Sequence, residues 1–204
     1  KRGPHGYGNS VRKTCNPNTP DDDQPTNSED LRFFFSYQVW HMYGRYFMWN
    51  FAGKTSDIQD EGWESGFNFS DKNMMPDFIR NQPAKNLYFF IPLILGLLGL
   101  GYQTLKRGND AAIVGMLFFF SGLAIDIYLN QYPMQPRERD YSFAGSFQTF
   151  AIWVGLGVIA LYELLKRYLG DMSAFIAAAI GLTAPFLMGS QNWDDHSRAG
   201  RYVA

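Results

Sequence analysis

The chain has 204 residues, and its 18 Lys and Arg side chains nearly balance its 19 Asp and Glu side chains. This balance removes the electrostatic case for nucleic-acid binding, and the single cysteine excludes an internal disulfide framework and a cysteine-based zinc site. Residues 1–86 hold 10 of the basic and 11 of the acidic side chains, whereas residues 87–190 hold only six of each. A polar arm followed by an apolar segment predicts an all-α polytopic membrane helix bundle.

The chain opens with a polar stretch, residues 1–30, that is rich in Gly, Pro, Asn and Asp and nearly free of large aliphatic side chains. Such a stretch buries too little apolar surface to offset the entropy of ordering it. We therefore predict a disordered arm here. Residues 54–86 are polar again and are interrupted by glycine and proline, so they are expected to form an external loop.

Residues 31–53, LRFFFSYQVWHMYGRYFMWNFAG, are dense in aromatic side chains. At helical spacing His41 and Arg45 fall on one polar stripe, and Trp40 and Tyr43 fall on the opposite side. Aromatic density with a polar stripe is typical of an amphipathic helix in the lipid headgroup region. A membrane span is the alternative, but Arg45 and His41 near its middle would be costly in hydrocarbon.

Four apolar runs follow within residues 87–190, and each is about as long as the roughly 30 Å hydrocarbon core of a bilayer requires. They cover 87–105, 111–132, 147–168 and 174–190. We therefore predict a bundle of about four transmembrane helices. Asp126 lies inside the second run, where it is expected to face the bundle interior. Its candidate roles are a proton or ion relay, a contact to a lipid ligand, or a hydrogen bond to a neighbouring helix.

Four spans would place the two short gaps 106–110 and 166–173 on one side of the membrane. The segments 1–86, 133–146 and 191–204 would all lie on the other side. Counting basic residues near the spans does not decide which side is cytoplasmic, because both sides carry them.

Charged side chains gather in the gap 133–146, which reads PMQPRERDYSFAGS. Arginine has a planar fork that binds phosphate bidentately, so Arg137 and Arg139 at a membrane surface suit a lipid phosphate. The alternative is a self-neutralising surface cluster in which Arg137 pairs with Asp140 or Glu138.

A second polar cluster lies in the tail 191–204, QNWDDHSRAGRYVA, which is expected to begin a C-terminal region. Asp194, Asp195 and His196 bring two carboxylates and an imidazole together, a set suited to a general base or to a divalent cation. Adjacent side chains diverge, however, so a turn stabilised by an Asp194–Arg198 ion pair is the competing interpretation. We assign no metal ligands.

Three strings carry a family resemblance: LRFFFSYQVWHMYGRYFMWNF (31–51), NQYPMQPRERDYSFAGSF (130–147) and QNWDDHSRAGRY (191–202). With the spans between them, they resemble an internal segment of a bacterial family of large integral membrane proteins of unknown function. That family is related to protein O-mannosyltransferase-like glycosyltransferases of the GT-C class.

The resemblance implies transfer of a sugar from a polyprenyl-phosphate donor to hydroxyls of an exported protein, outside the bacterial inner membrane. The segments 1–86, 133–146 and 191–204 would then be extracytoplasmic. Membrane lipid, the lipid-linked sugar and the exported acceptor would be the partners, and the catalytic base would lie outside this chain.

Within the resemblance, the matching arginines Arg137 and Arg139 are the expected ligands of the donor phosphate. Asp140, Asp194, Asp195 and His196 are the remaining site candidates. Two other functions stay open: a transporter or flippase of lipid-linked sugar that uses Asp126 as a switch, and a non-catalytic membrane scaffold.

Overall fold

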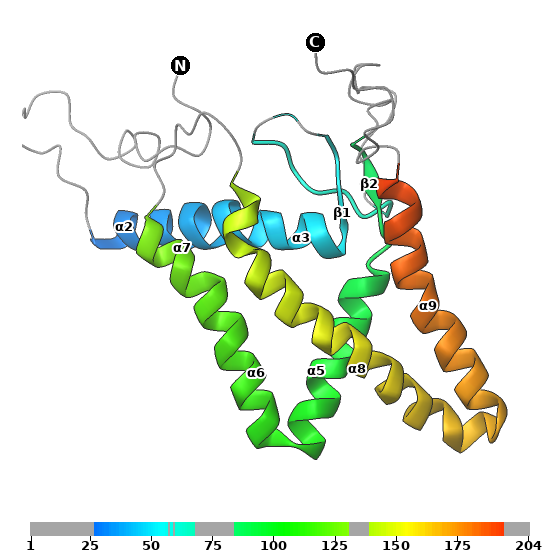
Figure 1. The fold of residues 1–204 in the computed structure, drawn as a ribbon. Coiled ribbons are helices and arrows are strands. Elements are labelled where there is room, and N and C mark those ends of the chain that lie inside the picture. The colour runs from blue at the N-terminus through cyan, green and yellow to red at the C-terminus, as the bar shows by residue number, and fades with distance from the viewer. Residues whose placement is uncertain (1–26, 57, 59, 68–83, 131–138, 194–204) are drawn as a thin grey trace, which may run out of the picture.

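The computed structural model describes residues 27–56, 58, 60–67, 84–130 and 139–193. These residues are almost entirely helical (Figure 1). In chain order the helices are α2 (Asn27–Phe33), the π-helix η1 (Phe34–Gly44), α3 (Arg45–Phe51), α5 (Ile91–Lys106), α6 (Gly108–Ser121), α7 (Leu123–Leu129), the 3₁₀ turn η2 (Asp140–Phe143), α8 (Ala144–Leu169) and α9 (Met172–Asn192). Two short strands, β1 (Gly53–Lys54) and β2 (Asn86–Leu87), pair antiparallel.

The apolar helices form two hairpins, one made by α5 with α6–α7 and one made by α8 with α9 (Figure 1). Both hairpin turns lie at the same end, drawn at the bottom of Figure 1, and α5 packs against α8 at the centre of the bundle. We call the turn end the lower end and the opposite end the upper end. The gaps 106–110 and 166–173 therefore share one end, as the four-span arrangement requires.

Three helices are long and apolar enough to cross a membrane: Gly108–Leu129, Asp140–Leu169 and Met172–Asn192. This is the composition of a membrane protein. The helix in the first apolar run, α5, is shorter, with 16 residues. It begins at Ile91 instead of 87 because Phe89 and Phe90 both have positive φ, at 51° and 57°, a backbone conformation that a right-handed helix excludes.

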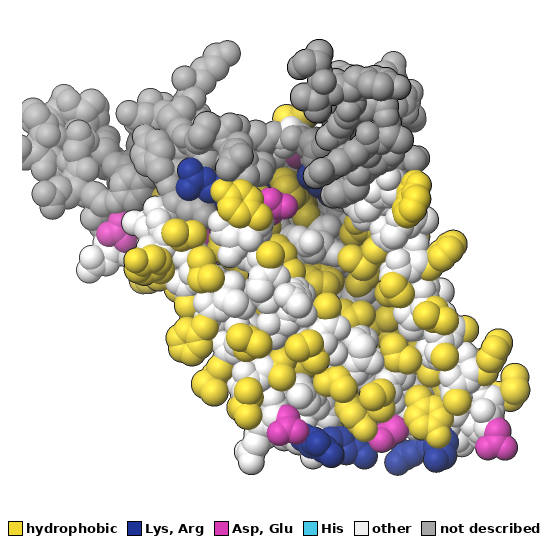
Figure 2. All heavy atoms as spheres, viewed as in Figure 1, with side chains coloured by type: hydrophobic (Ala, Val, Ile, Leu, Met, Phe, Trp, Pro, Cys, Tyr) yellow, Lys and Arg dark blue, Asp and Glu magenta, His cyan; other side chains and the backbone are white. Residues whose placement is uncertain are grey.

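Side chains on the surface follow this arrangement (Figure 2). Exposed aliphatic and aromatic side chains cover the body of the hairpins, including Phe120 on α6 and Phe175 and Phe186 on α9. Basic and acidic side chains gather at the lower end, where Lys106 of the first hairpin forms an ion pair with Glu163 of the second at 3.1 Å. An apolar belt bounded by charge is the surface that a bilayer requires.

The aromatic segment forms a nearly continuous helix, α2–η1–α3, that lies across the upper ends of the hairpins (Figure 1). It begins at Asn27, four residues before the start expected at residue 31, so residues 27–30 are helical, while residues 1–26 lie outside the described residues. In η1 the hydrogen bonds span five residues, as from the Arg45 N–H to the Trp40 carbonyl. This winding changes the faces: Trp40 is 56% exposed, whereas Tyr43, expected beside it, is buried.

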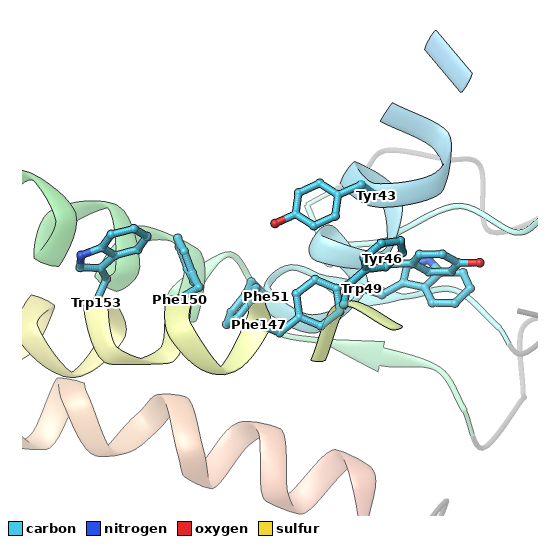
Figure 3. Close-up of a cluster of buried hydrophobic side chains, with 8 residues drawn as sticks. Tyr43, Tyr46, Trp49, Phe51, Phe147, Phe150 and Trp153 are labelled. Carbon is cyan, nitrogen blue, oxygen red and sulfur yellow. The ribbon is translucent and has the colours of Figure 1, made fainter. Parts of the chain in front are cut away.

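Aromatic side chains join this helix to α8 (Figure 3). The rings of Phe51 of α3 and Phe150 of α8 pack at a tilt, with 4.5 Å between their centroids. Phe47 forms an edge-to-face contact with the same Phe150 ring at 4.8 Å. The whole cluster contains Tyr43, Tyr46, Trp49, Phe51, Phe143, Phe147, Phe150 and Trp153. Aromatic side chains have the largest apolar area of any residues, so this cluster fixes where the helix lies on the bundle.

Glycines allow the backbones of α5 and α8 to touch. A Cβ atom on Gly99 would overlap the carbonyl oxygen of Trp153, and one on Gly157 would overlap the carbonyl oxygen of Leu95. Small residues at helix contacts are typical of membrane bundles, where association depends on close packing.

Replacing Gly99 by alanine should therefore separate α5 from α8 and lower the free energy of unfolding by about 1–3 kcal/mol, as overpacking does. Gly101→Ala is the matched control, because nothing lies within 4 Å of a Cβ at Gly101 in the same helix. Thermal unfolding in detergent measures both variants. Equal unfolding temperatures for the two would show that the backbones are not in contact.

Candidate functional site

Three side-chain hydrogen bonds join the aromatic helix to residues that flank segment 131–138. The Gln38 amide donates to the Asn130 side-chain carbonyl, before the segment. After it, the Arg139 backbone N–H donates to the Tyr46 hydroxyl at 3.5 Å, and the hydroxyls of Tyr43 and Ser146 share a hydrogen bond of 2.5 Å. The arginine-bearing string is thus held at both ends against the aromatic string.

The predicted phosphate ligand Arg139 lies at this junction. Its backbone is held by Tyr46, which is 1% exposed, while its own side chain is exposed and forms no ion pair with the residues that the structure describes. Asp140 is also exposed, and its Oδ1 accepts a hydrogen bond from the Tyr141 backbone N–H at 2.9 Å. The structure therefore presents the Arg139 fork at the upper end, with its backbone hydrogen-bonded to the aromatic helix.

The other predicted site residues, Arg137, Asp194, Asp195 and His196, lie outside the described residues. Gln191, three residues before Asp194, is described, however. Gln191 accepts a hydrogen bond from the Leu87 backbone N–H at 2.5 Å and donates one to the Leu87 carbonyl at 2.8 Å. This double contact ties the end of α9 to β2 at the upper end, the same end as Arg139.

Tyr43 and Ser146 form a buried polar pair that periodicity did not indicate. Burial raises the pKa of Tyr43 to about 12, so its hydroxyl stays protonated near neutral pH and keeps the contact to Ser146. The two side chains pack against Gly122, where a Cβ would lie 2.7 Å from the Tyr43 hydroxyl and 2.5 Å from the Ser146 hydroxyl.

Asp126 is 1% exposed and faces the bundle interior, as predicted. It lies one turn after Gly122, and its backbone N–H donates to the Gly122 carbonyl at 3.0 Å. Of its three candidate roles, the hydrogen bond to a neighbouring helix is not seen at the buried Oδ2, which has no partner in the described part of the chain.

His41 and Arg45 were expected on a polar stripe and are instead buried against the loop that follows α3. The Arg45 guanidinium donates to the Glu61 carbonyl at 3.0 Å and lies over the Trp49 ring at 4.8 Å. His41 Nε2 lies within hydrogen-bond distance of Asp60 Oδ1, at 3.3 Å. The loop thus covers the polar stripe, which keeps its charge paired.

The described residues of the loop after α3 form no cation site. No three His, Cys, Asp or Glu side chains among the described residues lie close enough together to hold a metal ion. Glu64, which is buried, is neutralised by Lys85 at 2.8 Å. The divalent cation considered for Asp194, Asp195 and His196 falls on residues outside the description.

Comparison with protein-family models, with curated proteins and with solved structures finds no match. What the chain does is therefore inferred from its own residues.

Arg45→Met keeps the apolar volume but removes the donors to the loop, and it should cost about 2 kcal/mol, as the loss of hydrogen bonds from a charged group does. The loop should then be cleaved faster by a glutamate-specific protease at Glu61. Arg32→Met is the matched control, because Arg32 lies on the same helix and is exposed. Unchanged cleavage of the Arg45 variant would contradict the assigned contact.

Asp126→Asn should leave the protein as stable as wild type or stabilise it by about 1 kcal/mol, because an amide is less costly to bury than an unpartnered carboxylate. Thermal unfolding of the purified protein in detergent measures the change. Asp171→Asn, at an exposed position, is the control for the loss of a charge. Clear destabilisation by Asp126→Asn alone would mean that the carboxylate has a stabilising partner.

Proposed function

We propose that this chain is a membrane-embedded segment of a GT-C-like glycosyltransferase, which moves a sugar from a polyprenyl-phosphate donor to hydroxyls of exported proteins. The observation that carries the proposal is the attachment of the arginine-bearing string to the aromatic helix on both sides of segment 131–138. Of the three strings that carry the family resemblance, the described parts meet at the upper end of the bundle.

In this proposal the bundle has four spans and lies in the bacterial inner membrane. The 16 residues of α5 would cover about 24 Å at the rise of an α-helix, and the turn of residues 87–90 would complete the crossing. The helix α2–η1–α3 would lie in the headgroup layer, with exposed Trp40 as an anchor. The upper end, with residues 1–86, 133–146 and 191–204, would be extracytoplasmic.

The proposed step breaks the bond between the anomeric carbon of the sugar and the phosphate oxygen. The acceptor hydroxyl oxygen forms a new bond to that carbon and loses its proton to a base outside this chain. Polyprenyl phosphate leaves with an additional negative charge. Arg139, together with Arg137, would bind and stabilise this anion, since fixed cations act most strongly where charge develops in the transition state.

The exposure of Arg139 supports this role. Unlike Arg45, whose guanidinium is bonded to the loop, Arg139 has an exposed side chain while its backbone N–H is bonded to Tyr46. In this proposal that side chain would face the headgroup layer. Asp140, next to it in η2, would orient the arginine or the acceptor, and Asp194, Asp195 and His196 remain candidates for the same task.

The test uses the whole protein in proteoliposomes with radiolabelled polyprenyl-phosphate hexoses and an exported acceptor protein. Arg139→Ala should reduce label on the acceptor about a hundredfold, as the loss of one charge-stabilising donor does. Arg139→Lys should restore part of the rate, because it keeps the charge and loses the fork. Arg137→Ala should act in the same direction.

Arg167→Ala is the control, because it removes an exposed arginine at the lower end. Normal transfer by folded Arg139→Ala protein would contradict the assignment of Arg139 to the donor site. Movement of the labelled lipid between leaflets without a new glycosidic bond would identify a transporter or flippase instead. Stable co-purification with a partner, together with tolerance of all these substitutions, would identify a scaffold.

A further inference from the structure

A groove of ≈ 590 Å³ lies at the upper end of α7, where this helix meets the start of the aromatic helix. Its lining comes from α2, η1 and the last turn of the first hairpin: Asn27, Asp30, Leu31, Phe33, Phe34, Gln38 and Asn130. The groove is shallow and open, since Asn27, Asp30, Leu31 and Asn130 are exposed. It combines apolar walls with a few polar groups, as small-molecule sites do.

The polar part of the groove is built around Gln38 and Asn130. The hydrogen bond between the two amides uses the Gln38 Nε2 and the Asn130 Oδ1. The Gln38 Oε1 and the Asn130 Nδ2 then remain, and they form no hydrogen bond within the described part of the chain. The two lining residues therefore keep one acceptor and one donor that are not used in this bond, and this is so whichever way the two amides are assigned.

The backbone conformation of Asn130 allows its side chain to bond with Gln38. Asn130 ends α7 with φ 39° and ψ 60°, a left-handed conformation that asparagine adopts more readily than most residues. Its own N–H donates to the Asp126 carbonyl at 3.1 Å. The side chain can therefore meet Gln38 without breaking the cap of the helix.

The remaining lining residues indicate the chemistry of a ligand. Phe33 and Phe34 supply aromatic surface. None of the described lining residues is Lys or Arg, so an anion would find no counter-charge in the groove itself. A neutral ligand with several neighbouring hydroxyls suits the spare acceptor and donor of Gln38 and Asn130 together with an apolar wall.

We propose that this groove binds a neutral saccharide, with two neighbouring sugar hydroxyls bonded to Gln38 and Asn130. The inference rests on the proposed function, which it deepens: the groove would hold the sugar of the donor, and the arginines Arg137 and Arg139 would hold the phosphate. The shared chemistry of lipid-linked and free saccharides makes either a potential source of the ligand.

The test measures equilibrium binding to the whole protein in nanodiscs. The probes are a short-chain polyprenyl-phosphate hexose and the same polyprenyl phosphate without sugar. Gln38→Leu combined with Asn130→Gly removes both amides, and glycine retains the left-handed backbone at position 130. We expect the double variant to bind the sugar lipid about tenfold more weakly, equivalent to one or two net hydrogen bonds, and to bind the sugar-free lipid within about twofold of wild type.

The sugar-free lipid reports on folding, and Gln148→Leu, which removes an exposed glutamine on α8, is the matched control. Equal weakening of both lipids, or no weakening of either, would overturn the inference. Octyl hexoside is added as a competitor to identify the source. Competition that the double variant loses would mean that the groove takes the saccharide with or without the phosphate. No competition, with the tenfold effect retained, would restrict the site to the lipid-linked form.

Failure of this inference can be told apart from failure of the proposed function, because binding is measured without transfer. If the sugar lipid binds in the groove but no label appears on any acceptor, the saccharide site is supported and the proposed glycosyltransferase activity is contradicted. If the double variant transfers sugar at the wild-type rate, the glycosyltransferase activity is supported and the saccharide site is contradicted.

Discussion

The contact between the backbones of α5 and α8 is the constraint on which the rest of the structure depends. Gly99 and Gly157 each face a carbonyl of the opposite helix at a distance that excludes any side chain. Because the driving force between apolar helices in lipid is close packing, this contact holds the two hairpins together. It also sets the separation of their upper ends, and thereby the surface on which the aromatic helix can lie.

The aromatic helix shows how a segment with both charge and large rings can be buried. Its rings pack on α8, while the loop after α3 covers His41 and Arg45 and supplies partners for them. Trp49 contacts both the bundle and the loop. Its ring is in the aromatic cluster, and its indole N–H donates to the Gly62 carbonyl of the loop at 3.0 Å. Apolar burial and satisfied polar groups are therefore provided by two different neighbours of one helix.

The helices could be predicted from sequence because apolar runs and helical periodicity are local signals. The faces of the aromatic helix could not, because the five-residue hydrogen bonds of η1 rotate Trp40 away from Tyr43. The late start of α5 could not be predicted either, because the apolar sequence gives no signal for the left-handed backbone at Phe89 and Phe90.

The candidate site, too, could be predicted only in part from the sequence. Arginine chemistry pointed to Arg139 from composition alone, and the structure adds the anchoring by Tyr46. The pairing of Gln38 with Asn130 joins residues 92 positions apart in the chain, so no local pattern could indicate it. The groove was missed for this reason: its polar pair exists only once the aromatic helix is docked on α7.

The glycine contact also has a mechanical consequence. Gly157 lies at the middle of α8, a helix of 26 residues, and Gly99 lies at the middle of α5. The upper half of α8, which follows Arg139, is also packed in the aromatic cluster, and its lower end carries Glu163 and the ion pair with Lys106. A stiff helix held at its upper half, its centre and its lower end resists bending and tilting. The upper surface and the charged turns, some 30 Å apart across the apolar belt, are thus kept at a fixed separation by one continuous helix.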